Sequence, residues 1–323
     1  MPPQFLMLPP QTAVTRGWAA RLATSVPGLS IIVAEDERQA EGAIAQAEAA
    51  FGTLPPELLR KAGRLRWLQA PNAAPPAGYY YPELIAHPVV VTNFREIFND
   101  HIGAHIMAFV LAFARGLHRY YPQQLNREWR PAARETGDVI HLPETTALIV
   151  GVGGIGAEAA RLAAAFGITV IGVDGRREDR PPGVKELHHP DRLDDQLPRA
   201  DFVILTVPHT PATEGFMNRA RFQRMKRSAY FINIGRGKTT RLDDLVAALD
   251  AGEIAGAALD VFEQEPLPSD HPLWTMPGVI ITPHTAGHGL YLDDRRYDII
   301  LDNCRRFLKG EPLRNVVDKA SWF

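Results

Sequence analysis

The feature that most constrains the fold is a regular alternation of short apolar segments with helical ones, seen twice along the chain. In the first hundred residues, strand-like segments occupy 4–9, 30–34, 47–51, 65–70 and 89–93. Helical patterns lie between them at 16–25, 55–63 and 82–87. Short links between alternating strands and helices predict a parallel sheet covered by helices.

A second alternation of the same kind begins after a charged, Pro-containing stretch. Its strand-like segments occupy 146–150, 168–173, 201–207, 229–234, 256–261 and 279–282, and an Ala-rich helix is expected at 155–166. A chain of 323 residues, 46% of them hydrophobic, is too long for one ordinary core and suits two domains. The sequence therefore predicts the α/β class with two doubly wound parallel sheets.

Two further helical segments bear on the domain layout. Residues 101–118 are apolar nearly all round, which is typical of a helix that is buried or that bridges two domains. Residues 290–309 read as a final helix. Because the second strand series already ends at Thr282, we expect this helix to return to the first domain.

Charge and composition exclude several classes of protein. Lys plus Arg total 35 and Asp plus Glu total 37, which gives a net charge of −2, so we expect neither a nucleic-acid nor a membrane partner. The single cysteine, Cys304, excludes an internal disulfide and a multi-cysteine metal site, and we expect no metal and a buried, inert thiol. The start of the chain lacks the pattern of a signal peptide and the apolar run at 102–114 is too short to span a bilayer, so we expect a cytoplasmic protein.

A glycine-rich turn follows the first strand of the second series. Gly151, Gly153 and Gly156 fit the pattern G-x-G-x-x-G between a strand and a helix. The first glycine permits a tight turn, the second lets the backbone approach a pyrophosphate, and the third lets helix and strand pack closely. The positive end of the helix then faces the phosphates, so the turn predicts a dinucleotide site.

An acidic residue and two arginines follow the next strand. Asp174 lies where an acid accepts hydrogen bonds from the ribose hydroxyls and repels a 2′-phosphate, which favours NAD. Arg176 and Arg177 stand just beyond it, where guanidinium groups either reach a 2′-phosphate or remain solvated. We therefore expect NAD as the cofactor, with NADP as the alternative.

The residues just beyond the later strands carry the chemistry, because ligands of open α/β sheets bind beyond the carboxyl ends of the strands. These segments are 208–210, 235–237, 260–265 and 283–285, and they supply an arginine, carboxylates and a histidine. Arginine is suited to bind a substrate carboxylate, and histidine can deliver a proton near neutral pH. A carboxylate beside the imidazole fixes its tautomer. This set predicts hydride and proton transfer to a small 2-keto acid.

Four motifs in order give a resemblance to a known family. The runs ADFVILTVPHTPATEGFMN, FINIGRG, GAALDVFEQEPLP and PLWTMPGVIITPHTAG resemble the D-isomer-specific 2-hydroxyacid dehydrogenases, which include glyoxylate/hydroxypyruvate reductases and phosphoglycerate dehydrogenases. The similarity is strong over 146–288 and weak over the first 60 residues. It implies a Rossmann NAD(P)-binding domain, 101–286, inserted in a flavodoxin-like substrate domain, 1–100 plus 287–323, and a homodimer formed through the cofactor domain.

The resemblance also implies residue roles. Arg236 would bind the substrate carboxylate, Glu265 would pair with the histidine, and His284 would be the general acid/base. The expected cofactor-binding residues are Gly151, Gly153, Gly154, Ile155, Gly156, Asp174, Arg176, Val207, Pro208, Thr213, Ile234, Gly235, Arg236, Asp260 and His284. Glu263 and His288 are competing candidates for the acid–base pair, and a structural ion pair is the competing interpretation of Arg236.

The departures from the family pattern fall on the substrate side. The family binds the substrate carboxylate through backbone N–H groups of a loop whose counterpart here contains Pro75 and Pro76, which have none. We expect substrate contacts from Asn72, Ala73 and Ala74, made through the Asn72 amide or the Ala74 N–H. The tyrosines at 79–81 either line an apolar pocket or pack the loop against the core.

Two more differences lie within the predicted bridging helix, at Ala104, and just before it, at Arg95. Ala104 stands where the family usually has a glutamate, and Arg95 is either a second substrate anchor or part of a surface ion pair. The leading prediction is thus a 2-keto-acid reductase that acts on a small-molecule acid. The alternatives are a formate- or phosphite-type dehydrogenase, against which Glu265 argues, and a non-catalytic NAD(H)-sensing interaction module.

Overall fold

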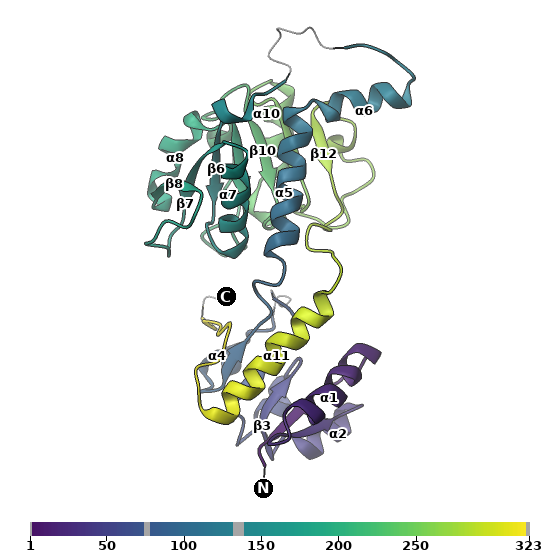
Figure 1. Cartoon of the computed structure of the whole chain (residues 1–323). Coiled ribbons are helices and arrows are strands. Elements are labelled where there is room, and N and C mark those ends of the chain that lie inside the picture. The colour runs from purple at the N-terminus through teal and green to yellow at the C-terminus, as the bar shows by residue number, and fades with distance from the viewer. Residues whose placement is uncertain (1, 74–77, 132–138, 321–323) are drawn as a thin grey trace. The chain divides into compact units, whose positions relative to one another are not determined.

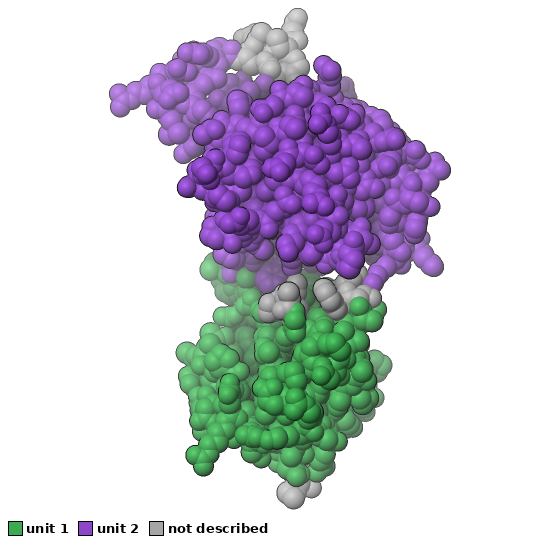
Figure 2. All heavy atoms as spheres, turned by 180° about the vertical axis from the view of Figure 1, so that it is seen from behind, with its two compact units in different colours: residues 1–97, 290–323 green, residues 98–289 purple. Residues whose placement is uncertain are grey.

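The computed structural model describes residues 2–73, 78–131 and 139–320, and the chain divides into two compact units. Unit 1 comprises Met1–Ile97 and Leu290–Phe323, and unit 2 comprises Phe98–Gly289 (Figure 2). The boundaries predicted from the sequence are 100/101 and 286/287. The first lies a few residues after the observed boundary, and the second lies a few residues before it. The difference at the first boundary arises because the helix expected from residue 101 begins at Asn99.

Unit 1 is a parallel sheet with helices on its faces (Figure 1). Its elements are β1 (Gln4–Met7), α1 (Ala13–Ser25), β2 (Ser30–Val33), α2 (Glu37–Ala43), β3 (Ala47–Phe51), α3 (Pro56–Leu59), β4 (Trp67–Gln69), α4 (Pro82–Ala86), β5 (Val90–Thr92) and α11 (Leu292–Lys309). Among the described residues the strand order is β2-β1-β3-β4-β5, with every pair parallel. This is the flavodoxin-type order of a doubly wound sheet.

The C-terminal helix α11 completes the core of unit 1. Trp67 on β4 is fully buried, and its ring lies 5.7 Å from that of Phe307 on α11. Asn303, also fully buried, donates to the carbonyl of Arg314 and accepts from its N–H at 3.2 and 2.7 Å. Burial of an asparagine requires such partners, so this pair fixes the turn that follows the helix.

Unit 2 is a larger parallel sheet, also flanked by helices (Figure 1). Its elements are α5 (Asn99–Ala114), α6 (Leu117–Leu125), η1 (Leu142–Glu144), β6 (Thr146–Val150), α7 (Gly154–Ala165), β7 (Thr169–Val173), β8 (Val184–His188), η2 (Pro190–Arg192), α8 (Leu193–Gln196), η3 (Leu197–Arg199), β9 (Phe202–Leu205), α9 (Arg219–Phe222), β10 (Tyr230–Asn233), η4 (Gly237–Thr239), α10 (Leu242–Asp250), β11 (Gly256–Leu259), η5 (Pro272–Trp274) and β12 (Val279–Ile281).

In the sheet of unit 2, the strands that follow β6 are added first on one side of it, β7 and β8, and then on its other side, from β9 onward. Among the described residues the order is β12-β11-β10-β9-β6-β7-β8, the arrangement of a Rossmann fold with an added edge strand. This change of side places the carboxyl ends of β6 and β9 at a topological switch point, where such sheets bind their ligands. The predicted class, two doubly wound parallel sheets, is confirmed.

Some local predictions were incomplete. The apolar stretch 101–118 is not one helix, because Gly116 takes a left-handed conformation, φ 67°, between α5 and α6. The sequence did not indicate α2 or the edge strand β8. Ala104 is exposed on α5, whereas Cys304 is fully buried on α11 as expected, and burial raises the pKa of its thiol. In the described part of the chain, no helix has the length and apolar character needed to cross a bilayer.

Candidate active site

The glycine-rich turn between β6 and α7 has the geometry that its glycines predict. Gly151 has φ 94°, a conformation that favours glycine. A Cβ on Gly156 would lie 2.0 Å from the Gly151 carbonyl oxygen, so helix and turn pack too closely for any other residue. A Cβ on Gly153 would meet nothing within 4 Å, which leaves its backbone open to a ligand.

The start of α7 fits a dinucleotide pyrophosphate. Gly153 precedes the helix, and its carbonyl accepts the N–H of Ala157 as the first intrahelical bond. The N–H groups before Ala157 therefore point out of the helix end, where its dipole favours negative charge. A Cβ on Gly154 would lie 2.6 Å from the Asn99 side chain, so this amide lies beside the helix start. Sequence reasoning missed Asn99, which no motif marks.

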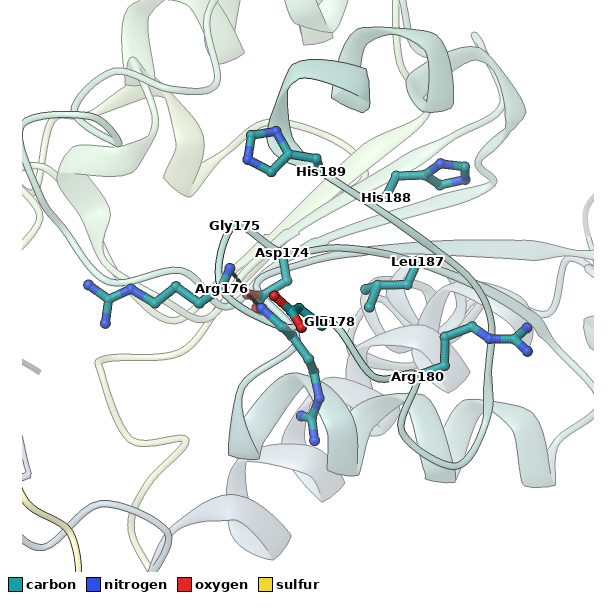
Figure 3. A pocket seen from close by; sticks show the side chains of 9 residues that line it. Asp174, Gly175, Arg176, Glu178, Arg180, Leu187, His188 and His189 are labelled. Carbon is teal, nitrogen blue, oxygen red and sulfur yellow. Dashed lines mark hydrogen bonds between the residues drawn. The ribbon is translucent and has the colours of Figure 1, made fainter.

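Asp174 follows β7 and fixes the local backbone (Figure 3). Its Oδ2 accepts the N–H of Val152 at 2.7 Å, and its Oδ1 accepts those of Arg176 and Arg177 at 2.8 and 3.0 Å. One carboxylate thus ties the glycine-rich turn to the β7–β8 connection. Three backbone donors also compensate part of its negative charge.

A pocket of about 450 Å³ lies beside Asp174. It is lined by Asp174, Gly175, Arg176, Arg177, Glu178, Arg180, Leu187, His188 and His189. Figure 3 shows the Arg176 side chain extending away from the Asp174 carboxylate. Arg177 instead donates to the Val152 carbonyl at 2.8 Å and to Asp179. Arginine, aspartate and histidine side chains so placed suit the ribose end of a dinucleotide.

The ends of β9 and β10 approach each other closely. A Cβ on Gly235 would lie 2.5 Å from the Val207 carbonyl oxygen, and one on Gly151 would lie 2.9 Å from Val207 Cγ1. The hydroxyl of Thr213 donates to the Pro208 carbonyl at 2.7 Å, which closes the turn after β9. Ile234 is buried behind Gly235. These residues form one wall next to the glycine-rich turn.

Arg236 extends from the turn after β10. The side chain of Asn233, fully buried, donates to the Arg236 carbonyl and accepts from the Gly235 N–H, at 3.2 and 3.0 Å. The Arg236 Nη1 donates to the Gly235 carbonyl at 2.7 Å. Burial lowers the pKa of Arg236 from its usual value, and nearby Glu265 opposes that effect. The guanidinium therefore keeps its charge in a partly desolvated place, which suits an anion site.

Glu265 and His284 form a directly bonded pair. Nδ1 of His284 lies 2.7 Å from Glu265 Oε2, and Glu265 Oε1 accepts the N–H of Phe262 at 2.9 Å. The carboxylate can only accept, so the imidazole donates from Nδ1 and presents Nε2 outward. The His284 side chain is 50% exposed. The imidazole is thus partly accessible from solvent.

The competing candidates for this pair lie elsewhere. Glu263 accepts the N–H of Leu242 at 2.8 Å, at the start of α10. His288 is exposed, beyond the His284 turn. Neither is bonded to His284 or Arg236 by any contact in the described residues.

Asp260, at the end of β11, is buried beneath the His284 turn, with 1% of its surface exposed. Its carboxylate accepts the N–H groups of Thr285 and Ala286 at 2.8 and 3.0 Å. Its carbonyl accepts the N–H of His284 at 2.8 Å. The Asp260 side chain is therefore occupied by the chain's own backbone.

The expected substrate residues of unit 1 are only partly described. The carbonyl of Ala73 accepts from the buried Asn93 side chain at 2.9 Å, and Asn72 is exposed. Ala74, Pro75 and Pro76 lie outside the described residues. The Arg95 side chain is exposed, and its backbone is fixed by Asn93 and Asn315, at 3.1 and 2.9 Å.

Two of the three consecutive tyrosines hold a neighbouring loop. The hydroxyl of Tyr79 donates to the Gly52 carbonyl at 3.0 Å, and that of Tyr81 to the Leu54 carbonyl at 2.9 Å. Tyr79 and Tyr80 are buried in the core of unit 1. Within the described residues the Tyr80 hydroxyl has no partner. These contacts favour packing of the loop over lining of a pocket.

Comparison with known proteins gives a consistent set of relatives. Residues 107–286 match the family model described as D-isomer specific 2-hydroxyacid dehydrogenase, NAD binding domain. Glyoxylate/hydroxypyruvate reductase B of Citrobacter koseri is 33% identical over 303 residues, which cover 91% of each chain. Glyoxylate/hydroxypyruvate reductase A of Photorhabdus laumondii is 34% identical over 214 residues, 66% of each chain.

Solved structures extend this similarity to the whole chain. A D-isomer specific 2-hydroxyacid dehydrogenase from Xanthobacter autotrophicus, in complex with NADPH and MES, superposes with a TM-score of 0.84 at 28% identity and covers 100% of both chains. An NADPH-dependent glyoxylate/hydroxypyruvate reductase from Sinorhizobium meliloti, in complex with NADP and sulfate, gives a TM-score of 0.81 at 29% identity, covering 99% of this chain and 100% of that one.

Proposed function

Because the chain belongs to the D-isomer-specific 2-hydroxyacid dehydrogenases, a family of NAD(P)-dependent oxidoreductases, we propose that it reduces small 2-keto acids of the glyoxylate and hydroxypyruvate class. The observation that carries the proposal is the Glu265–His284 pair, at 2.7 Å, in a unit that also presents Arg236. Relatives at 33 and 34% identity are named glyoxylate/hydroxypyruvate reductases, which supports this substrate class.

Each of the three side chains has a distinct role in the proposed reaction. A nicotinamide held in unit 2 would supply the hydride that is added at C2 of the keto acid. His284, protonated on both nitrogens, delivers the Nε2 proton to the oxygen at C2 while Nδ1 keeps its bond to Glu265. Glu265 holds the ring in one orientation and stabilises its charged form. Arg236 binds the substrate carboxylate with its planar fork of donors.

In this proposal, residues at the strand ends of unit 2 would hold the cofactor. The backbone of Gly153, Gly154 and Ile155 would hold its pyrophosphate, and Asp174 would hold its ribose. Val207, Pro208, Thr213 and Ile234 would line the nicotinamide half, whereas the expected cofactor residue Asp260 is buried and would support the neighbouring His284 turn. On unit 1, Asn72, Ala73 and Arg95 contact the substrate.

We propose that NADPH is accepted as well as NADH. Asp174 favours NADH, but its carboxylate already accepts three backbone N–H groups, and Arg176 and Arg180 line the same pocket. Two structurally similar proteins were solved with NADPH or NADP. A charge-assisted bond to a 2′-phosphate contributes about 1.5–3 kcal/mol, so Arg176→Ala is expected to lower kcat/KM for NADPH by about 10- to 100-fold and to leave NADH almost unaffected.

We also propose a homodimer through the cofactor domain. Helix α6 buries none of its residues within the chain, and Leu117, Tyr121 and Leu125 are more than half exposed. Exposed apolar side chains gathered on one helix are typical of an interface. Light scattering should give twice the 35.7-kDa chain mass, and Leu125→Asp should reduce it to that of one chain. The matched control is Leu290→Asp, at an exposed leucine of unit 1.

The decisive experiment is a turnover assay with a panel of 2-keto acids and both reduced cofactors. Glyoxylate, hydroxypyruvate and bulkier 2-keto acids are supplied in turn, and cofactor oxidation is followed at 340 nm. Reduction of one or more of them is the expected result. Oxidation of formate or phosphite with no keto-acid reduction would support the second enzyme class instead. Cofactor binding without any turnover would support a sensing module, and either outcome would contradict the proposal.

A further inference from the structure

A chain of side-chain hydrogen bonds runs beneath the His284 turn of unit 2. It begins at His105 on α5, whose Nε2 lies 3.1 Å from the Thr282 hydroxyl. That hydroxyl lies 2.6 Å from Oδ1 of the buried Asp260. The chain thus links α5 to the carboxylate at the end of β11, through the residue two before His284. Sequence reasoning gave neither His105 nor Thr282 a role in the site, although Thr282 lies within the motif that carries His284.

The direction of these hydrogen bonds follows from the chemistry of the groups. A carboxylate only accepts, so the single hydroxyl proton of Thr282 is donated to Asp260. The Thr282 oxygen must then accept from His105, which therefore carries a proton on Nε2. Burial lowers the pKa of His105, and Asp260 only partly opposes this, so the neutral ring with its proton on Nε2 is favoured. The His105 ring packs edge-on against Phe109, with centroids 4.7 Å apart.

Asp260 in turn holds the catalytic turn. Its carboxylate binds the N–H groups of Thr285 and Ala286, and its carbonyl binds that of His284. His284 has φ 53°, in the left-handed region that is strained for a non-glycine residue. Such a conformation persists only when the surrounding contacts determine it. The contacts from Asp260 therefore help to hold the backbone of the His284 turn in this conformation.

We propose that His105 and Thr282 are positioning residues for the reaction, which act by fixing the Asp260 carboxylate and through it the His284 turn. The proposal rests on the function proposed above, in which His284 delivers the proton. Neither side chain contacts the reacting atoms in this account. A misplacement of about 1 Å at a reacting group can reduce the rate by about 100-fold, so loss of these hydrogen bonds should lower kcat measurably.

The Thr282 hydroxyl is tested with a pair of variants of the full-length protein. Thr282→Val removes the hydroxyl at nearly constant shape, and Thr282→Ser retains it. We expect Thr282→Val to lower kcat by about 10- to 100-fold, with KM for the reduced cofactor changed by less than about twofold. Thr282→Ser should retain most of the activity. Normal kcat in Thr282→Val, with or without a lower melting temperature, would overturn the proposal.

His105 has its own matched pair. His105→Gln retains a side-chain N–H donor, whereas His105→Phe retains the ring that packs on Phe109 but removes the donor. We expect kcat to decrease in the order wild type, His105→Gln, His105→Phe. The pH profile of kcat should shift only in His105→Phe. Equal activity of the two variants would contradict the proposed role of the donor.

A third variant separates this proposal from the function on which it rests. His284→Ala is assayed in the same series, with cofactor affinity followed by fluorescence titration. If His284→Ala retains turnover, the proposed function and the positioning role both fail. If His284→Ala is inactive and Thr282→Val is normal, only the positioning role fails. If Thr282→Val weakens cofactor binding alone, Asp260 acts on the cofactor rather than on the turn, which also overturns the proposal.

Discussion

The strand-end turns of unit 2 and the substrate loop of unit 1 are built in different ways. In unit 2, buried carboxylates and amides such as Asp260 and Asn233 hold the backbone of each turn at two or three points. In unit 1, the described part of the loop is held at Ala73 by one side chain, Asn93, and the tyrosines behind it bind other backbone carbonyls.

From this difference we expect unit 2 to determine the type of reaction and unit 1 to determine the choice of keto acid. A proton donor and a hydride acceptor must be placed accurately, and the dense hydrogen bonding of unit 2 supplies that accuracy. The described part of the unit 1 loop is held through Ala73, and this loop is where the sequence departs from the family pattern. We therefore expect substitutions in unit 2 to affect turnover of every keto acid, and those in unit 1 to affect the keto acid more than the cofactor.

The largest effect on stability is expected from a change in the glycine-rich turn. Gly156→Ala places a Cβ 2.0 Å from a backbone oxygen, so we expect a loss of about 3 kcal/mol in the free energy of unfolding. The matched variant Gly153→Ala enters open space and should change stability by less than about 0.5 kcal/mol. It should nevertheless weaken cofactor binding. Chemical denaturation and fluorescence titration give the two readouts, and equal stability of the variants would contradict the account.

The next effect concerns the carboxylate of the acid–base pair. Glu265→Gln keeps the shape but removes the charge that stabilises the protonated ring, so kcat for reduction should fall by about 100-fold at neutral pH. The activity that remains should be greater at lower pH. Glu263→Gln is the control, because Glu263 binds the start of α10 and, among the described residues, has no bond to His284. A pH-rate profile checks this, and equal kcat for the two variants would refute the assignment of Glu265.

A substitution in unit 1 tests the other side of the comparison. Asn93→Ala removes the donor that holds the Ala73 carbonyl, together with the acceptor of the Arg95 N–H. We expect KM for the keto acid to rise by about tenfold, since a bond of about 1.4 kcal/mol is lost from the loop, while KM for the cofactor stays within about twofold. Steady-state kinetics with each substrate varied in turn measure both. A change in KM for the cofactor alone would contradict the proposed difference between the two units.

The smallest effect is expected at the tyrosines. Tyr81→Phe removes the bond to the Leu54 carbonyl and should lower the free energy of unfolding by about 1 kcal/mol, with kcat/KM for keto acids unchanged. Tyr80→Phe is the comparison, since this hydroxyl has no partner among the described residues and its loss should cost little. Altered selectivity among keto acids in either variant would show that the tyrosines line the substrate pocket.

Much of unit 2 was predictable from sequence because its signals are local. Gly151, Gly153 and Gly156 mark a strand–turn–helix unit by spacing alone, and Asp174 falls at the end of the next strand. The Glu265–His284 contact joins two strand ends, so its residues were inferred from the family motifs, while their distance came from the structure.

The contacts that escaped prediction join residues far apart in sequence. His105 reaches Thr282 across 177 positions, and nothing near either residue signals the other. Asn99 lies beside Gly154 only because α5 and α7 pack together. The break at Gly116 was missed because the apolar pattern continues through it, and a single glycine inside such a pattern is ambiguous.

The central claim is that His284 delivers the proton from a turn held by unit 2. Its most direct test is His284→Ala, assayed for keto-acid reduction with a saturating reduced cofactor and, separately, for cofactor affinity. The account predicts that kcat falls by about 10²- to 10⁴-fold while the dissociation constant of the cofactor stays within about twofold. Near-normal reduction of every accepted keto acid by His284→Ala would contradict it.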